Sequence, residues 1–151
     1  MLILGIDPSL CHTGLAILDA DANKIIYKRT LNTGSKQPIE TRLYHIFVHV
    51  RDLINNTKIT EVAIETQFMG KHASALKVAA AYAACILGCQ IYGVFLHHYS
   101  PKYIKKKFTG YANADKSLMI NSVALLYGFW ADDSHIADAV AVAHVHKHFP
   151  S

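Results

Sequence analysis

Short hydrophobic runs separated by turn residues open the chain. Leu2 to Ile6 is almost continuously apolar, which is typical of a strand covered on both faces. Pro8 and Ser9 break the run, and Gly14 to Leu18 then forms a returning strand. Lys24 to Leu31 adds a third strand, so this part of the chain predicts an antiparallel meander.

The next segment changes to the period of a helix. Its apolar residues recur with helical spacing on one face, and Asn55 and Asn56 end the pattern. The residues of this stripe are Leu43, Ile46, Phe47, Val50, Leu53 and Ile54.

Strands and helices alternate through the rest of the chain. The predicted elements are a strand over Glu61–Glu65, an Ala-rich helix from Ala73 to Cys89, a strand from Ile91 to Leu96, a basic helix from Pro101 to Phe108, a helix from Asp115 to Tyr127 and a final helix beginning near Asp132 or Asp133. A meander followed by strand–helix–strand units predicts an α/β fold, with a mixed five-stranded sheet and helices on both faces. No linker is long enough to divide the chain, so we expect residues 1–151 to form one domain.

Composition narrows the class of protein. Hydrophobic residues make up 52% of the chain, which excludes a disordered protein. No apolar run reaches the roughly 18–20 residues of a membrane span, and no basic region precedes the first apolar segment as in a signal peptide. Cys85 and Cys89 lie one helical turn apart in an apolar helix and are expected to be reduced core residues. We therefore expect a soluble intracellular protein, whose net charge of +4 permits an anionic partner.

Acidic residues end two of the predicted strands, Asp7 the first and Glu65 the fourth. If these strands are parallel neighbours, both acids lie at the carboxyl edge of the sheet, where α/β proteins place their chemistry. In the final helix His135 and Asp138 are three residues apart and share a face, with Asp132 expected on the same stripe.

Carboxylates gathered with one imidazole suit Mg²⁺ or Mn²⁺. Two such ions about 4 Å apart can stabilise the attacking and leaving oxygens of a phosphodiester displacement. Each residue alone has a structural explanation, because Asp is common in turns and at helix starts. The shared position of Asp7 and Glu65 at the same end of two strands favours the metal site.

Four segments of the chain contain these candidate residues or lie between them. They are Leu4-Gly-Ile-Asp7-Pro-Ser with Thr13-Gly14, Ala63-Ile-Glu65-Thr-Gln-Phe68-Met-Gly-Lys71 with Ser74-Ala-Leu-Lys77, Thr109-Gly110 with Ala114-Asp-Lys116-Ser117, and Ser134-His135-Ile-Ala-Asp138 through His144. In this order and spacing they resemble RuvC-type Holliday junction resolvases, and the resemblance covers nearly the whole chain.

The resemblance implies a ribonuclease H-like fold, a homodimer and Mg²⁺-dependent cleavage of four-way DNA junctions by paired nicks, as in DNA recombination and repair. It implies two ions per site, replaceable by Mn²⁺, with no organic cofactor and no membrane partner. Asp7, Glu65, His135 and Asp138 match the metal-binding and catalytic positions. Some relatives carry Asp where this chain has His135, and the imidazole could either bind metal or position the attacking water.

Candidate DNA-binding residues follow from the same resemblance. Phe68 matches an aromatic residue that wedges into the junction centre, although a Phe here could equally pack beneath the following helix. Lys71 is a candidate phosphate contact. In the basic stretch, Lys105, Lys106 and Lys116 are further candidates, with an ordinary solvated helix face as the alternative.

Other functions fit parts of the pattern. Within the same fold the chain could cut forks or flaps, or process RNA. An actin- or hexokinase-like ATP-binding module also begins with an Asp-bearing strand and hairpin, but 151 residues supply only one of its halves. A catalytically silent DNA-binding protein has no need for the acids. We expect a junction endonuclease of the cytoplasm, in a bacterial or phage-infected cell.

Overall fold

One mixed sheet forms the centre of the computed structural model, which describes residues 1–66 and 74–150. Its strands are β1 (Leu2–Asp7), β2 (His12–Asp19), β3 (Lys24–Asn32), β4 (Glu61–Glu65) and β5 (Phe95–Tyr99). In space they follow the order β3-β2-β1-β4-β5, with β1, β2 and β3 antiparallel and β4 and β5 parallel to β1. The predicted meander is confirmed, and the first and fourth strands are parallel neighbours, which is the condition on which Asp7 and Glu65 were expected at one edge.

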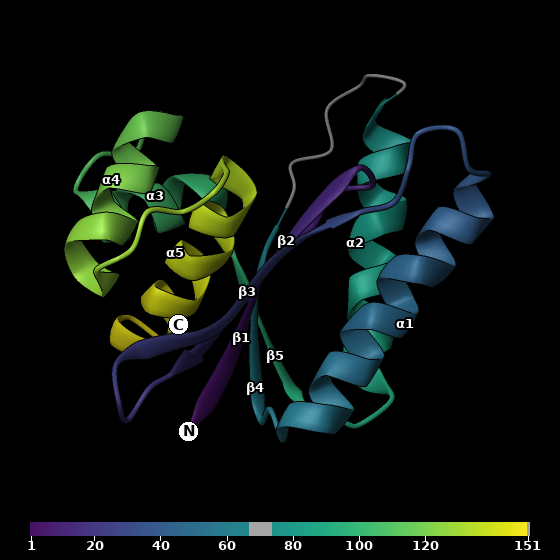
Figure 1. Ribbon diagram of the computed structural model, residues 1–151, viewed down its shortest axis with the longest axis horizontal. Coiled ribbons are helices and arrows are strands. Elements are labelled where there is room, and N and C mark those ends of the chain that lie inside the picture. The colour runs from purple at the N-terminus through teal and green to yellow at the C-terminus, as the bar shows by residue number, and fades with distance from the viewer. Residues whose placement is uncertain (67–73, 151) are drawn as a thin grey trace.

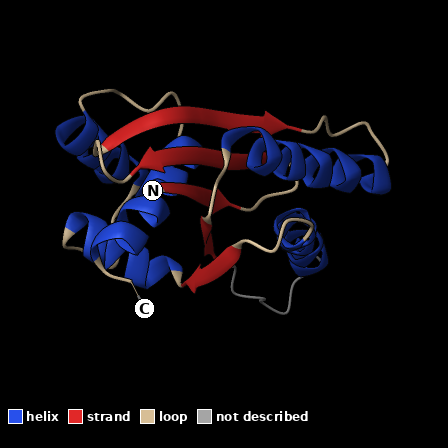
Figure 2. Ribbon diagram, turned by 90° about the horizontal axis from the view of Figure 1, so that it is seen from below, coloured by secondary structure: helices blue, strands red, loops and turns tan. Residues whose placement is uncertain are grey.

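Helices cover both faces of this sheet, as predicted. They are α1 (Ile39–Thr57), α2 (Ser74–Gln90), α3 (Pro101–Thr109), α4 (Lys116–Tyr127) and α5 (Ser134–His148). Figure 1 shows α1 and α2 on one side of the sheet and α3, α4 and α5 on the other. Figure 2, turned by 90°, shows the strands running between these two groups of helices.

Alternation along the strands decides which residues face which helices. In β1, Ile3 packs in the core beneath α5, whereas Leu4 and Ile6 pack in the core beneath α1 and α2. Successive side chains of a strand point to opposite faces, so Asp7 lies on the α5 side together with Ile3. By the same rule Glu65 shares the α5 side with Ala63.

The fifth strand begins later than the sequence predicted. The expected strand from Ile91 to Leu96 is wrong in its bounds, because β5 spans Phe95–Tyr99. Gly93 adopts a positive φ of 62° in a turn after α2, and Ile91 and Tyr92 are exposed in that turn. The chain therefore joins the sheet only after this turn, although the apolar residues of the turn are typical of a strand.

The cysteines fall into two classes. Cys85 and Cys89 are buried in the core between α2 and the sheet, and burial raises the pKa of both thiols. Cys11 is exposed in the turn that joins β1 to β2. Among the helices of residues 1–66 and 74–150, none combines the length and the hydropathy that crossing a lipid bilayer requires.

Candidate active site

Strand register brings Asp7 and Glu65 to the same edge of the sheet. Ile6 pairs with Ile64 in the parallel ladder between β1 and β4, and the two acids are the next residues along each strand. Both occupy the α5 side, so they lie between the carboxyl ends of two central strands and the helix that crosses them.

Two glycines let α5 lie directly against the sheet. A Cβ atom on Gly5 would stand 2.0 Å from the carbonyl oxygen of Ala139, and one on Gly14 would stand 2.1 Å from the carbonyl oxygen of His135. Any side chain at either position would push the helix away. This close approach holds the first turns of α5, which carry His135 and Asp138, over Asp7.

The start of α5 is tied to the meander by its capping residue. The backbone N–H of Ile136 donates to Asp133 Oδ1 at 2.9 Å, and the hydroxyl of Thr30 donates to Asp133 Oδ2 at 2.6 Å. Asp132 was expected on the same stripe as His135 and Asp138. It instead precedes the helix and pairs at the surface with Lys28 at 3.1 Å.

A small hydrogen-bonded turn fixes the segment after Asp7. The hydroxyl of Thr13 donates to the carbonyl oxygen of Ser9 at 2.5 Å, and the N–H of Ser9 donates to Thr13 Oγ1 at 3.3 Å. Thr13 is fully buried, so both bonds are protected from water. The turn through Pro8 and Ser9 is thereby fixed beside the acid.

His135 is the direct polar neighbour of Asp7. Its Nδ1 lies 3.1 Å from Asp7 Oδ2. Burial raises the pKa of Asp7, and the hydrogen bond from His135 opposes that rise. The same hydrogen bond raises the pKa of His135. Since a carboxylate only accepts, Nδ1 carries the proton of this bond and Nε2 is the ring atom left for other chemistry.

Burial and neighbouring negative charges disfavour the ionised forms of Glu65 and Asp138. Burial, followed by the charges of Asp7 and Asp138, raises the pKa of Glu65 to about 8. Burial and the charge of Asp7 raise the pKa of Asp138 to about 7. Lys105 opposes both shifts, and Lys116 opposes that of Asp138. The four predicted residues therefore act on one another at a single edge, where the carboxylates disfavour one another's ionisation.

This donor set fits a divalent cation. Three carboxylates and one imidazole offer the oxygen and nitrogen atoms that Mg²⁺ and Mn²⁺ accept. A cation among them would offset the mutual repulsion that raises the pKa values of Glu65 and Asp138. Within the described residues, no three of these four side chains bring their ligand atoms within 4.8 Å of one another.

The predicted DNA-binding residues are placed in part. Lys105 is half-buried on α3, Lys106 is exposed on the same helix, and Lys116 is exposed at the first position of α4. The charges of Lys105 and Lys116 lower the pKa of Asp138, and Lys105 also lowers that of Glu65, so both lysines act electrostatically on the acids. Phe68 and Lys71 lie outside the described residues.

His12 is a further neighbour of the site, to which no definite role could be assigned from sequence alone. Its ring stacks on that of His135, with centroids 5.4 Å apart, and its Nδ1 lies 2.5 Å from Asn32 Oδ1. The signal available in the sequence was its position five residues after Asp7, in the turn beside the active edge.

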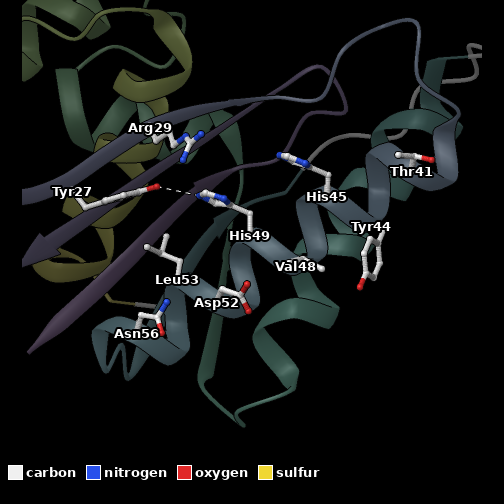
Figure 3. Close-up of a pocket in the computed structure, with 10 residues that line it drawn as sticks. All are labelled: Tyr27, Arg29, Thr41, Tyr44, His45, Val48, His49, Asp52, Leu53 and Asn56. Carbon is white, nitrogen blue, oxygen red and sulfur yellow. Dashed lines mark hydrogen bonds between the residues drawn. The ribbon is translucent and has the colours of Figure 1, made fainter.

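A separate hollow of about 500 Å³ lies between β3 and α1 (Figure 3). The hydroxyl of Tyr27 and Nε2 of His49 meet there at 3.1 Å, and Arg29 and His45 lie close by. Burial and the charge of Arg29 lower the pKa of His49, which is therefore neutral at pH 7. None of the four acidic-site residues lines this hollow, which adds nothing to that site.

Comparison with known proteins matches almost the full chain. The family profile named Crossover junction endodeoxyribonuclease RuvC matches residues 3–146. The chain is 35% identical to the RuvC of Brachyspira hyodysenteriae, covering 97% of this chain and 93% of that protein. It is 33% identical to the RuvC of a Wolbachia from Brugia malayi, covering 99% and 95%.

Solved structures of junction resolvases are similar to this chain in fold. The structure of Thermus thermophilus RuvC in complex with a Holliday junction substrate superposes with a TM-score of 0.86 at 28% identity, covering 97% of this chain and 92% of that one. A yeast mitochondrial Holliday junction resolvase shares the fold, with a TM-score of 0.62 at 13% identity.

Proposed function

Because the chain belongs to the RuvC family of crossover junction endodeoxyribonucleases, we propose that it resolves four-way DNA junctions by hydrolysing phosphodiester bonds in paired nicks. The observation that carries this proposal is the meeting of Asp7, Glu65, His135 and Asp138 at one sheet edge. Residues 1–151 act in it as one nuclease domain.

We propose that these four residues hold two Mg²⁺ ions, with Mn²⁺ as an effective substitute. Bound there, the ions would supply charge stabilisation for the attacking and leaving oxygens of the displacement. Ionised carboxylates are needed for this, so binding competes with the protons that Glu65 and Asp138 retain near neutral pH.

His135 contributes through the nitrogen that Asp7 does not occupy. Its Nδ1 is held by Asp7 at 3.1 Å, which fixes the ring and its tautomer. Nε2 is then the atom through which the neutral ring would bind a cation or accept a proton from the attacking water. The stacked ring of His12 further restricts rotation of His135.

DNA contacts are assigned to the cationic residues beside the acids. Lys105 and Lys116 would bind the phosphates that flank the cut, and exposed Lys106 would extend this surface. Such contacts supply affinity and orientation rather than sequence selection. Phe68 is proposed as the wedge at the junction centre and Lys71 as a further phosphate contact.

Two coordinated nicks require two sites, and we propose a homodimer to provide them. An apolar groove on the α1–α2 surface supports this, since Leu43, Phe47, Ala83 and Leu87 line it with few polar atoms. This surface lies across the sheet from α5, so pairing through it leaves the acidic edge of each copy open (Figure 1). Bacterial relatives support action in the cytoplasm, on bacterial or phage DNA.

The decisive test supplies labelled four-way, forked and linear DNA with Mg²⁺. Wild-type protein is expected to nick the four-way junction symmetrically. Asp7→Asn and Asp138→Asn are expected to slow cleavage about 10²-fold or more while leaving junction binding intact, because each removes part of a charge stabilisation worth several kcal/mol. Asp21→Asn, at an exposed acid in the turn between β2 and β3, at the opposite end of the β1–β2 ladder from Asp7, is the matched control.

Three results would contradict the proposal. Normal cleavage by either active-edge variant would show that the site is wrongly assigned. Equal rates on forked and four-way DNA would indicate a broader branched-DNA nuclease. Nucleotide hydrolysis without DNA cleavage would remove the nuclease altogether.

A further inference from the structure

A second cluster of ligand-type side chains lies on the α5 side of the sheet, away from the active edge. Glu61 opens β4, His97 is the middle residue of β5, and His146 lies near the end of α5. One ligand atom from each lies within 4.8 Å of the other two. Among the described residues, no other three His, Cys, Asp or Glu side chains bring their ligand atoms this close together.

The spacing of these atoms suits one small cation. Nε2 of His146 lies 2.5 Å from Glu61 Oε2, and Nε2 of His97 lies 3.8 Å from the same oxygen. Ligand atoms of a tetrahedral zinc ion, bound at about 2.0–2.1 Å, stand about 3.3 Å apart. The observed separations bracket that value, so side-chain rotations are enough to form the coordination.

Tyr99 orients one of the imidazoles. Its hydroxyl lies 2.7 Å from Nδ1 of His146, on the side of the ring away from Glu61. Without a cation, Nε2–H of His146 donates to the Glu61 carboxylate and Nδ1 accepts from the Tyr99 hydroxyl. A cation bound at Nε2 would displace that proton, and Nδ1–H could then donate to the Tyr99 hydroxyl oxygen. Histidines that bind metals usually have their other ring nitrogen held in this way.

His97 and Glu61 are partly accessible to solvent, whereas His146 is buried. The His146 side chain is 3% exposed, whereas His97 and Glu61 are 31% and 27% exposed. The cluster thus has a buried floor and a side open to solvent, through which an ion and a completing water could enter.

This cluster is distinct from the acidic edge. Glu61 and Glu65 face the same side of β4 four residues apart, which is about 13 Å along a strand. His146 and Asp138 are eight residues apart on α5, about 12 Å along a helix. An ion here would touch neither Asp7 nor Asp138. It would instead join β4, β5 and α5, the elements that position the acidic edge.

We propose that Glu61, His97 and His146 form a second metal site, which binds one Zn²⁺ ion through one carboxylate oxygen and two imidazole nitrogens. Imidazole ligands select zinc over Mg²⁺, which prefers oxygen. The ion fastens the end of α5 to the sheet, independently of the ions proposed at the active edge.

The test uses full-length protein carrying Asp7→Asn and Asp138→Asn, so that binding at the active edge is disabled. The metal-free protein is titrated with Zn²⁺ by equilibrium dialysis, and Co²⁺ is followed by its visible absorption as a report of tetrahedral nitrogen ligation. We expect one tightly bound equivalent. Adding His97→Ala or Glu61→Gln should weaken binding at least about 10-fold.

Matched controls come from neighbouring histidines. His98 follows His97 on β5 but faces the other side of the sheet, where it contacts Tyr82. His144 and His148 form a two-ligand pair on α5 with ring centroids 4.4 Å apart. His98→Ala and His148→Ala should each keep the full equivalent, and Tyr99→Phe should lose about 10- to 100-fold in affinity.

Three results would overturn the proposed zinc site. Zinc binding that survives both His97→Ala and Glu61→Gln overturns the site. So does loss of the ion in His148→Ala alone, or no tight binding by the starting protein. Glu61→Gln preserves side-chain shape at a partly exposed position, so it reports on the ligand even if a histidine variant folds poorly.

Discussion

At the scale of single residues, the fold disfavours the ionised forms of the acids at the active edge. Asp7 is 6% exposed, and Glu65 and Asp138 add their charges beside it. One imidazole and the charges of Lys105 and Lys116 offset part of the cost. The cation proposed for this edge would offset the rest of that cost.

Replacing one acid should therefore stabilise the metal-free fold. The pKa of Glu65 is raised to about 8 from an ordinary 4.5, so the folded state binds more protons than the unfolded chain between these values. Stability then falls as pH rises through this window. At pH 8 without metal, Glu65→Gln should gain about 1 kcal/mol or more, or roughly 2–4 °C in Tm.

Thermal unfolding at pH 5 and pH 8, with and without Mg²⁺, checks this expectation. The gain should shrink at pH 5, where Glu65 is protonated, and when Mg²⁺ stabilises the wild type. Asp21→Asn, at the exposed acid that also serves as the cleavage control, should change little at either pH. A lower Tm for Glu65→Gln at pH 8 would contradict the electrostatic explanation.

At the scale of elements, the position of α5 decides whether the site exists. The helix rests on β1 and β2 through Gly5 and Gly14, where its backbone is in contact with theirs. Asp133 caps the helix and is itself held by Thr30 of β3. Two close contacts and one cap thus set the height and start of the helix that delivers His135 and Asp138.

Gly14→Ala should disable the enzyme by moving this helix. The new Cβ would stand 2.1 Å from the carbonyl oxygen of His135, so α5 must shift and His135 leaves its contact with Asp7. We expect at least about 10²-fold slower junction cleavage, since small displacements of catalytic groups have such effects.

Gly128→Ala separates this effect from general destabilisation. Gly128 ends α4 with a φ of 73° and has open space around its missing Cβ, so the change costs about 1 kcal/mol of backbone strain. It should lower Tm while leaving cleavage near the wild-type rate. Similar activity losses in both variants would show that stability, not helix position, is responsible.

Local patterns explain which elements could be predicted. The acids at the ends of β1 and β4 and the helical stripe of α1 are each visible within a few residues, and the meander of β1, β2 and β3 follows from the turn residues between short apolar runs. The start of β5 was missed because Ile91 and Tyr92 look buried but lie in an exposed turn set by Gly93.

Long-range contacts explain what the sequence could not reveal. Glu61 meets His146 across 85 residues of chain, and neither belongs to a motif. Asp132 shares helical spacing with His135, yet the helix starts after it, and the cap at Asp133 decides that boundary. The grouping of Asp7, Glu65, His135 and Asp138 was predictable because register and helix spacing each bring two of them together.

At the scale of the whole molecule, the two faces of the sheet carry different candidate binding features. The α5 side carries the acidic edge and the Glu61–His97–His146 cluster, and the α1–α2 side carries the apolar groove. A dimer formed through the groove would give one particle two copies of the acidic edge, which is the number that paired nicks require.

Leu87→Glu should therefore disrupt the proposed dimer. Leu87 lines the groove and is 60% exposed in the single chain, so a charge there would be buried on pairing. Sedimentation velocity should show half the wild-type mass, and four-way junctions should receive single rather than paired nicks. Leu125→Glu, at an exposed leucine of α4, should remain dimeric. A dimeric Leu87→Glu protein would place the interface elsewhere.

The contrast among the three cysteines makes the wild-type chain ready for labelling. Cys85 and Cys89 are buried with raised pKa values, so a maleimide dye at neutral pH should leave them unmodified. Cys11 is exposed, and the next residue, His12, stacks on His135. One fluorophore per chain can therefore be placed beside the acidic edge without mutagenesis. In a dimer, energy transfer between two such dyes would follow, molecule by molecule, how far the two edges separate as a junction opens.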